Sequence, residues 1–393
     1  MDQKLCWFYL ASVSELGRKD VERLLERFKT SEGIWNAAWE DIGLVLEQDE
    51  KKIEAMKRRK QEEKLVTEYK QMTGKGIFFV TKEEEAYPKS LRDIYEAPYY
   101  LFYKGELPDC TKPSIAVIGA RNCSFYGNEM AKYFARELAA AGVQIISGLA
   151  YGIDGYAHEG ALSAKKKTFG VLGCGVDVCY PKENLELFLK MEKQGGILSE
   201  YPPGSMPLAY HFPMRNRIIS GLADGILVIE ARNRSGTLIT VDRGLEQGKD
   251  IYAIPGKITD VLSAGCNHLI QKGAKLVMSP DDILEELSYR FECIQTFYAE
   301  EDGQMSLVKG GEGRKKKRSR EEVDSHIRRI VGLLAPEERS VYEVLGMQPK
   351  HLETILHETL MAPQKAIRIL LSLELKGVVT QTSKNYFVIN LLG

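Results

Sequence analysis

Residues 115–127 read IAVIGARNCSFYG, a short apolar run that ends at Gly119 and is followed two residues later by Arg121. A continuous apolar run of this kind is typical of a strand that is buried on both faces of a parallel sheet. A strand, a glycine loop and a helix in this order direct backbone N–H groups and the positive end of the helix dipole toward an anion. The guanidinium of Arg121 has a geometry suited to phosphate. The loop is therefore compatible with a phosphate site, or with a tight turn that carries a surface arginine.

The same alternation of strand and helix continues along the chain. We expect further strands over 144–147, 168–172, 196–199, 226–229 and 251–254, and helices over 128–141, 155–164, 183–193 and 237–247. This order predicts an α/β domain with a doubly wound, mainly parallel sheet. Residues 76–110 precede the first glycine loop, and we expect them to pack beside the sheet as an extension.

The loops at the carboxyl ends of the expected strands carry small and basic residues that suit an anion. Open α/β sheets bind ligands at this edge, so several such loops together predict a polyanion or a nucleotide as ligand. The candidates on these loops, beside Gly119 and Arg121, are Ser147, Gly148, Gly152, Gly173, Tyr180, Lys182, Ser235, Gly236 and Thr237.

Two arginines flank an asparagine at Arg215, Asn216 and Arg217, ahead of the strand expected at 226–229. Residues two apart on a helix do not share a face, so one arginine can contact the ligand while the other has a structural role. Phe212 either stacks on a base or fills the core. Glu230, at the end of the next strand, either holds one of the arginines or acts as a catalytic carboxylate.

Several common site signatures are missing from the sequence. The first loop is not G-x-G-x-x-G and no acid ends the second strand, which argues against a dinucleotide cofactor. There is no P-loop, no nucleophile elbow and no cluster of metal-ligand type. The seven cysteines are dispersed without a C-x-x-C pair, which fits reduced thiols in a cytosol. We expect neither cofactor nor metal.

The overall charge gives no sign of a nucleic-acid partner. Lys and Arg number 54 and Asp and Glu 55, a net charge of -1, so any nucleic-acid binding must depend on local clusters. No apolar run is long enough to span a membrane, and the first residues lack the apolar segment of a signal peptide. We expect a cytoplasmic protein.

The flanking regions differ in composition from the centre. Residues 1–75 have the apolar spacing of helices and predict an N-terminal helical domain, ahead of the central domain over 76–298. Residues 299–325 predict a flexible linker whose basic run at 314–318 is either a solvated tether or a phosphate contact. Residues 326–393 form a third module. Its expected helices cover 323–334, 337–345, 350–358 and 363–376, and a hairpin of 378–381 with 386–389 follows, the plan of a winged helix.

Taken in order, these loops resemble those of the DNA-processing protein A family (DprA, also called Smf). The resemblance covers nearly the whole chain and is strongest over 87–287. The stretches that carry it are 87–91, 103–105, 121–127, 147–154, 173–175, 180–181, 212–219, 235–237 with Thr240, 255–256, 265–270 and 273–274.

The resemblance implies a Rossmann-like central domain, an N-terminal module of sterile-alpha-motif or helix-hairpin-helix type, and a winged-helix module. It implies a binding protein rather than an enzyme. Such proteins bind and protect single-stranded DNA during natural transformation, help load the RecA recombinase, and dimerise through the Rossmann-like domain. Arg121, Lys182, Arg215 and Arg217 would contact phosphates. The glycines would allow close backbone approach, and Tyr180 or Phe212 would stack on bases.

Two alternatives remain open from the sequence. The central domain also resembles, more distantly, Rossmann-like phosphoribohydrolases, which cleave the base from a nucleoside monophosphate with an Arg and a Glu near a glycine-rich loop. Arg215, Glu230 and residues 235–237 would be the counterparts here. For the winged helix, insertion of the helix over 363–376 into a DNA groove and use of the domain for protein contacts are both compatible with the sequence.

Overall fold

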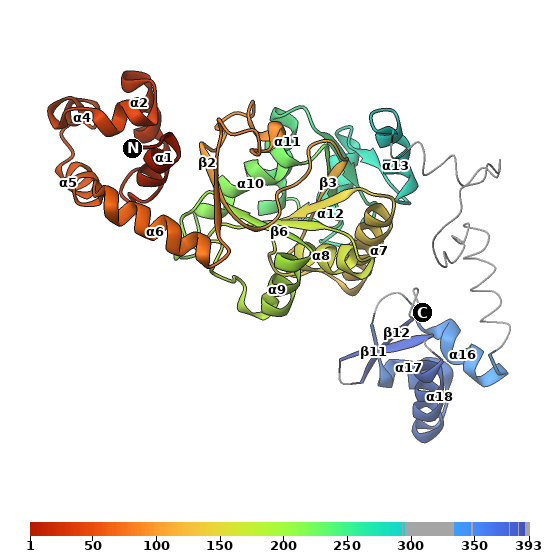
Figure 1. Ribbon diagram of the computed structural model, residues 1–393. Coiled ribbons are helices and arrows are strands. Elements are labelled where there is room, and N and C mark those ends of the chain that lie inside the picture. Colours follow the sequence, from red (N-terminus) through yellow and green to blue (C-terminus); the bar gives the residue numbers. More distant parts are fainter. Residues whose placement is uncertain (293, 295–333, 347–348, 377, 384, 390–393) are drawn as a thin grey trace, which may run out of the picture. The chain divides into compact units, whose positions relative to one another are not determined.

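The computed structural model describes all residues except 293, 295–333, 347–348, 377, 384 and 390–393 (Figure 1). The chain divides into two compact units, Met1–Asp302 and Gly303–Gly393, and each is described by itself. The expected linker over 299–325, with its basic run at 314–318, lies outside the described residues. So does the expected helix over 323–334, apart from Leu334.

A nine-stranded sheet forms the centre of the first unit, in the order β1-β2-β6-β5-β4-β3-β7-β8-β9 (Figure 1). All neighbours from β6 to β9 pair in parallel, while β1 and β2 form an antiparallel edge. The doubly wound, mainly parallel sheet is thereby confirmed. The strands are β1 Phe78–Thr81, β2 Tyr100–Gly105, β3 Ser114–Ile118, β4 Gln144–Ser147, β5 Thr168–Val171, β6 Gly195–Ser199, β7 Gly225–Val228, β8 Asp250–Ala253 and β9 Lys275–Leu276.

Helices cover both faces of the sheet, and strand alternation decides which side chain serves which face. On β3, Ile115 and Val117 pack into one core with α7 and α8, whereas Ala116 and Ile118 pack into another with α10 and α11. The helices after β3 are α7 Phe125–Ala140, α8 Ile153–Ser163, α9 Leu185–Lys193, α10 His211–Leu222, α11 Gly236–Glu246, α12 Ala264–Gln271 and α13 Asp281–Ser288. The short 3-10 helices are η1 Lys89–Leu91 and η2 Lys182–Asn184.

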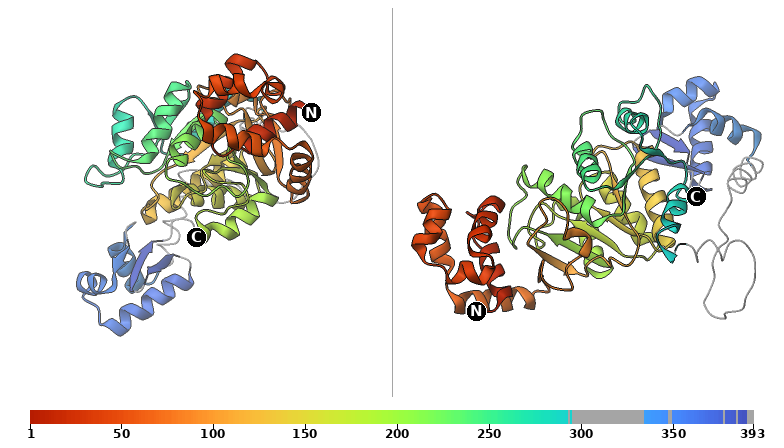
Figure 2. Two further views of the ribbon diagram at one scale, coloured as in Figure 1. Left: turned by 90° about the vertical axis from the view of Figure 1, so that its left-hand side faces the viewer. Right: turned by 90° about the horizontal axis from the view of Figure 1, so that it is seen from above.

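Six helices lie at one end of this unit, and α1 packs against β1 at the antiparallel edge of the sheet (Figure 2). They are α1 Gln3–Ala11, α2 Arg18–Phe28, α3 Ser31–Asn36, α4 Trp39–Val45, α5 Glu50–Arg59 and α6 Glu62–Gly74. The ring of Phe8 lies edge-on to Phe79 of β1, with centroids 5.7 Å apart, and also contacts Phe102 of β2. The helical region and the extension over 76–110 therefore share one apolar core. No described helix has the length and apolar composition of a membrane span.

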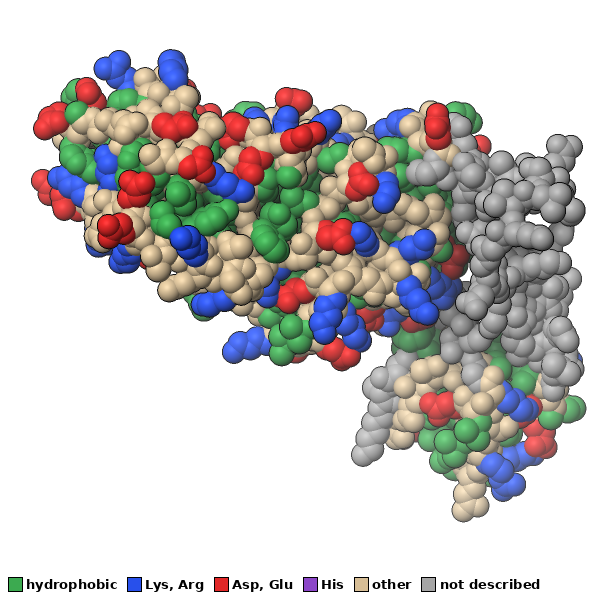
Figure 3. All heavy atoms as spheres, in the orientation of Figure 1, with side chains coloured by type: hydrophobic (Ala, Val, Ile, Leu, Met, Phe, Trp, Pro, Cys, Tyr) green, Lys and Arg blue, Asp and Glu red, His purple; other side chains and the backbone are tan. Residues whose placement is uncertain are grey.

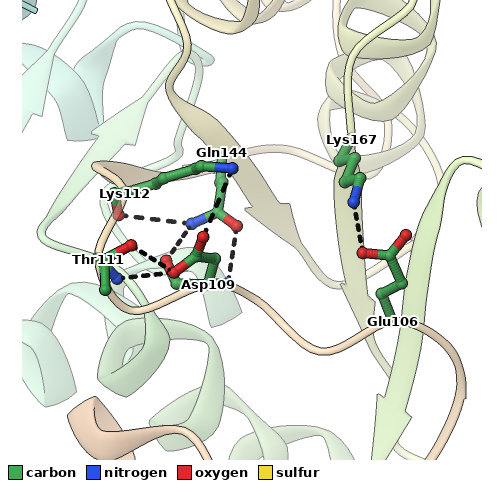
Figure 4. Close-up of polar contacts among 6 residues, drawn as sticks. All are labelled: Glu106, Asp109, Thr111, Lys112, Gln144 and Lys167. Atoms are coloured by element: carbon green, nitrogen blue, oxygen red, sulfur yellow. Dashed lines mark hydrogen bonds and ion pairs between the residues drawn. The ribbon is translucent and has the colours of Figure 1, made fainter. Parts of the chain in front are cut away.

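Side-chain amides and carboxylates fix the connection from β2 to β3 at the amino ends of the central strands (Figure 4). The side chain of Gln144 donates to the Asp109 carbonyl at 2.8 Å and accepts from the Asp109 N–H at 2.9 Å. The carboxylate of Asp109 in turn accepts from the N–H and the hydroxyl of Thr111. These hydrogen bonds hold the β2–β3 connection against the amino edge of the sheet. The glycine loops lie at the opposite, carboxyl edge.

The second unit has the winged-helix architecture. Its elements are α16 Pro336–Val344, β10 Lys350–His351, α17 Leu352–Thr359, α18 Pro363–Leu375, β11 Val379–Ser383 and β12 Tyr386–Ile389. The three strands pair in the order β10-β12-β11. The unit has an apolar core of its own, in which Val341, Ile355, Leu370 and Leu373 are fully buried.

Candidate nucleic-acid interface

A cleft of about 660 Å³ opens at the carboxyl edge of the sheet, where β3 and β7 are neighbours. The chain runs from β3 to β4, β5 and β6 on one side, and β7 begins the other side, so the strand order reverses at this point. Ligands of open α/β sheets bind at such switch points. We call it the switch cleft. Its lining includes Gly119, Arg121, Asn122, Tyr180, Phe212, Arg215, Asn216, Arg232, Ser235, Gly236 and Thr237.

The loop after β3 brings Arg121 to the cleft. Gly119 is required for its path, because a Cβ there would lie 2.6 Å from Cγ1 of Ile153. The hydroxyl of Thr237 donates to the Gly119 carbonyl at 3.1 Å and so joins this loop to the start of α11. Arg121 is exposed, and among the described residues no carboxylate forms an ion pair with it. Its charge is therefore available to an anionic ligand.

Two aromatic rings lie beside this free charge. Tyr180 and Phe212 have their ring centroids 5.7 Å apart at a tilt of 40°, and Tyr180 is partly exposed. The guanidinium carbon of Arg121 lies 5.3 Å from the centroid of Phe212, within cation–π range. The cleft thus offers a ring surface and a cation side by side.

The start of α11 supplies uncharged donors to the same cleft. Ser235, Gly236 and Thr237 line it, and the first N–H groups of a helix have no partner within the helix. A Cβ built on Gly236 meets nothing within 4 Å, so the space in front of it is open. The hydroxyl of Ser235 is buried and has no hydrogen-bond partner among the described residues. These groups and the helix dipole favour an anion here.

Arg215 forms part of the cleft wall but is already engaged by the protein. Its Nη1 donates to the Gly148 carbonyl at 2.8 Å and to the Val171 carbonyl, and its Nε donates to Asn216. Burial lowers the pKa of Arg215 to about 10, with Asp154 opposing the shift, so the side chain stays charged at neutral pH. Arg215 therefore ties the loops after β4 and β5 together and contributes a buried positive charge.

Among the described residues, Glu230 forms no ion pair with Arg215 or Arg217. Its carboxylate accepts hydrogen bonds from the N–H of Ser124 at 2.8 Å and from the hydroxyl of Ser124 at 2.5 Å. The Ser124 hydroxyl also accepts from the N–H of Gly127 and so caps α7. Burial raises the pKa of Glu230, while the bonds from Ser124 oppose the rise. The contacts indicate a structural use for this carboxylate.

The remaining sequence candidates lie outside the switch cleft. Gly148 and Gly173 line a small adjoining cavity together with Tyr180 and Phe212. The hydroxyl of Ser147 donates to a backbone carbonyl, and Gly152 precedes α8 with a φ of 72°. Lys182 is exposed at the start of η2. Arg217 also lies outside the switch cleft.

Arg217 is the clearest departure from the sequence-based set. It is only 1% exposed, and its Nη2 donates to Glu200 at 2.5 Å. The i, i+2 relation to Arg215 places it on another face of α10, as the helix period requires. In its place the cleft gains Asn122 and Arg232. Arg232 follows the carboxyl end of β7, and that position could have marked it as a candidate.

Comparison with known proteins matches both units. Residues 78–288 match the family model described as DNA recombination-mediator protein A, and residues 332–383 match the DprA winged helix domain. The DNA processing protein DprA of Streptococcus pneumoniae is 50% identical over 206 residues, which are 52% of this chain and 73% of that protein.

Two solved structures are also similar to the chain. The X-ray structure of Streptococcus pneumoniae DprA has 38% sequence identity and a TM-score of 0.63. The matched region covers 73% of this chain and 99% of the Streptococcus pneumoniae chain. The DprA of Helicobacter pylori, described by its single-stranded DNA binding mode, is 29% identical with a TM-score of 0.49, and covers 54% of this chain and 97% of that one.

Proposed function

The chain belongs to the DNA recombination-mediator protein A family, and from this premise we propose that it binds single-stranded DNA in the switch cleft without altering it chemically. The observation that carries the proposal is the position of unpaired Arg121 beside the Tyr180–Phe212 ring pair and the open start of α11. Membership of a family of DNA recombination mediators indicates DNA as the ligand. The cleft has groups that can contact both the phosphates and the bases of a DNA strand.

The rings favour a single strand over a duplex. Base faces are stacked inside a duplex, whereas an unpaired strand can lay a base on an aromatic side chain at a gain of roughly 1–3 kcal/mol per base. We expect Tyr180 or Phe212 to take such a base, and Arg121 and the first amides of α11 to take phosphates. Exposed Lys182 stays a proposed phosphate contact just outside the cleft, and Arg217 is no longer part of the proposed site.

The contacts of Glu230 support a binding role rather than phosphoribohydrolase chemistry. A catalytic carboxylate must face the ligand, and this one accepts both of its hydrogen bonds from Ser124. Arg215, the other counterpart, already donates to backbone carbonyls. We therefore propose a protein that is not an enzyme and uses no cofactor.

Membership of the family and the resemblance described above support a wider role. We propose that the protein acts in the cytoplasm as a homodimer formed by the Rossmann-like domain. It would protect incoming single-stranded DNA during natural transformation and help load RecA onto it.

The test is the charge reversal Arg121→Glu, measured by the binding of labelled single-stranded oligonucleotides of several sequences. A charge-assisted hydrogen bond contributes about 1.5–3 kcal/mol, so we expect affinity to fall by roughly tenfold or more, alike for all sequences. Lys166→Glu reverses an exposed charge at the amino edge of the sheet and should leave binding near the wild-type value. Wild-type affinity in Arg121→Glu would remove the proposed site from the switch cleft.

A further inference from the structure

A second, shallower depression adjoins the switch cleft, with a volume of about 450 Å³. It lies between the loop after β7 and the loop after β8, and we call it the second lobe. Arg232 lines both the switch cleft and the second lobe, so the two adjoin at that side chain. The other residues of its lining that matter here are Asn233, Arg234, Ile258, Asp260 and Val261.

The second lobe carries an excess of positive charge. Arg232, Arg234 and neighbouring Lys257 are exposed, and among the described residues none of them forms an ion pair. Asp260 is the acidic residue of the lining, and its carboxylate accepts from the Leu262 N–H and the Ser263 hydroxyl at 3.1 and 3.2 Å. That carboxylate shapes the turn, so three cations face solvent without a partner.

Apolar side chains lie next to these cations. Ile258 is 93% exposed and Val261 is 63% exposed, both on the loop after β8. Single exposed apolar residues need no explanation, but two in a depression beside unpaired arginines offer a contact surface for a ligand with both apolar and anionic parts. A nucleic-acid strand has this composition at every nucleotide.

We propose that the second lobe binds the stretch of the same DNA strand that leaves the switch cleft past Arg232. Arg234 and Lys257 contact its phosphates, and Ile258 and Val261 contact its bases. The inference rests on the proposed function and extends it, because it assigns a ligand longer than the switch cleft can hold. It follows that these side chains matter for a long strand and not for a short one.

The test compares the double variant Arg234→Gln/Lys257→Gln with the wild-type full chain on single strands of about 4 and about 20 nucleotides, over a range of salt concentrations. We expect wild-type affinity for the short strand and about tenfold weaker binding of the long strand. The salt slope of log K for the long strand should become shallower by roughly 1.4, since each lost phosphate contact removes about 0.7.

The matched control is Lys165→Gln/Lys166→Gln, which removes two exposed charges at the amino edge of the sheet and should change neither affinity nor slope. A double variant that binds the long strand with wild-type affinity and slope overturns the inference and leaves the proposed function standing. Equal losses on both strands also overturn it. Failure of the wild-type chain to bind either strand would instead overturn the proposed function, and the inference with it.

Discussion

At the scale of single residues, we expect a substitution of Gly236 to weaken DNA binding without weakening the fold. A Cβ at this position meets nothing within 4 Å, so Gly236→Ala should keep or raise stability, by about 0.4–1 kcal/mol. The added methyl group stands in the cleft before the first amides of α11, so affinity for single-stranded DNA should fall. Thermal unfolding and binding titrations measure the two effects.

Gly148→Ala is the contrasting variant. Its Cβ would lie 2.5 Å from Nη1 of Arg215, a group held by backbone carbonyls, so we expect a loss of about 1–3 kcal/mol in stability. If Gly236→Ala bound DNA as tightly as the wild type, the ligand would not approach the start of α11.

His158 gives the fold a dependence on pH. The ring is fully buried, its Nδ1 lies 2.7 Å from the hydroxyl of Thr168, and that hydroxyl donates to the Ile145 carbonyl, so Nδ1 carries a proton and donates to the hydroxyl. Burial, with a smaller contribution from Arg215, lowers the pKa of His158 to about 3. Between pH 6.5 and 3 the unfolded chain takes up a proton that the folded chain does not.

Stability should therefore be complete above pH 6.5 and fall below it, by about 2 kcal/mol on going from pH 6.5 to 5. Denaturant titrations at several pH values measure this, with His158→Gln as the comparison. That variant should be less stable at neutral pH and should have a flatter profile between pH 7 and 5. Equal slopes in both proteins would contradict the account of His158.

For the two arginines of α10, the sequence predicted part of the arrangement but not all of it. Helix periodicity states that Arg215 and Arg217 occupy different faces, but it does not state which face meets the cleft. Glu200, seventeen residues earlier on another loop, decides it by pairing with Arg217. The position of Gly119 and Arg121 at the carboxyl end of a buried strand was predictable, whereas contact of Arg121 with a phosphate stays a prediction.

At the scale of elements, α18 offers adjacent leucines with opposite roles. Leu370 is fully buried in the core of the second unit, whereas Leu371 is 52% exposed. Leu370→Ala should cost about 2–5 kcal/mol because it leaves a cavity, and Leu371→Ala should stay within about 0.5 kcal/mol. Unfolding of the winged-helix unit, followed by circular dichroism, measures both, and similar losses in the two variants would contradict the packing of α18.

The parallel strands β3 to β8 were predictable to within a residue, whereas the parallel edge strand β9 and the antiparallel strands β1 and β2 were not. β3 to β8 are short runs buried on both faces, which leave a continuous apolar signal in the sequence. β1 and β2 were expected only as part of an extension, and their rings Phe79 and Phe102 pack against Phe8 of α1. β10 has two residues, too few to show any period.

At the scale of the whole molecule, we expect DNA binding to depend on a local site and not on the overall charge of the protein. Lys and Arg are interspersed with Asp and Glu over the face of the first unit drawn in Figure 3, in keeping with a net charge of -1. A long-range field would not distinguish single-stranded from duplex DNA. We therefore expect selectivity to come from the geometry of the switch cleft, where the rings need an unpaired base.

Competition for the full chain tests this claim most directly. A labelled single strand is bound, and unlabelled single strand, duplex of the same sequence and mononucleotide are added in turn. We predict that the single strand displaces the label, that the duplex needs at least about tenfold more, and that the mononucleotide competes weakly because it makes few of the contacts. Equal competition by the duplex, or by the mononucleotide, would contradict an interface built for an unpaired strand.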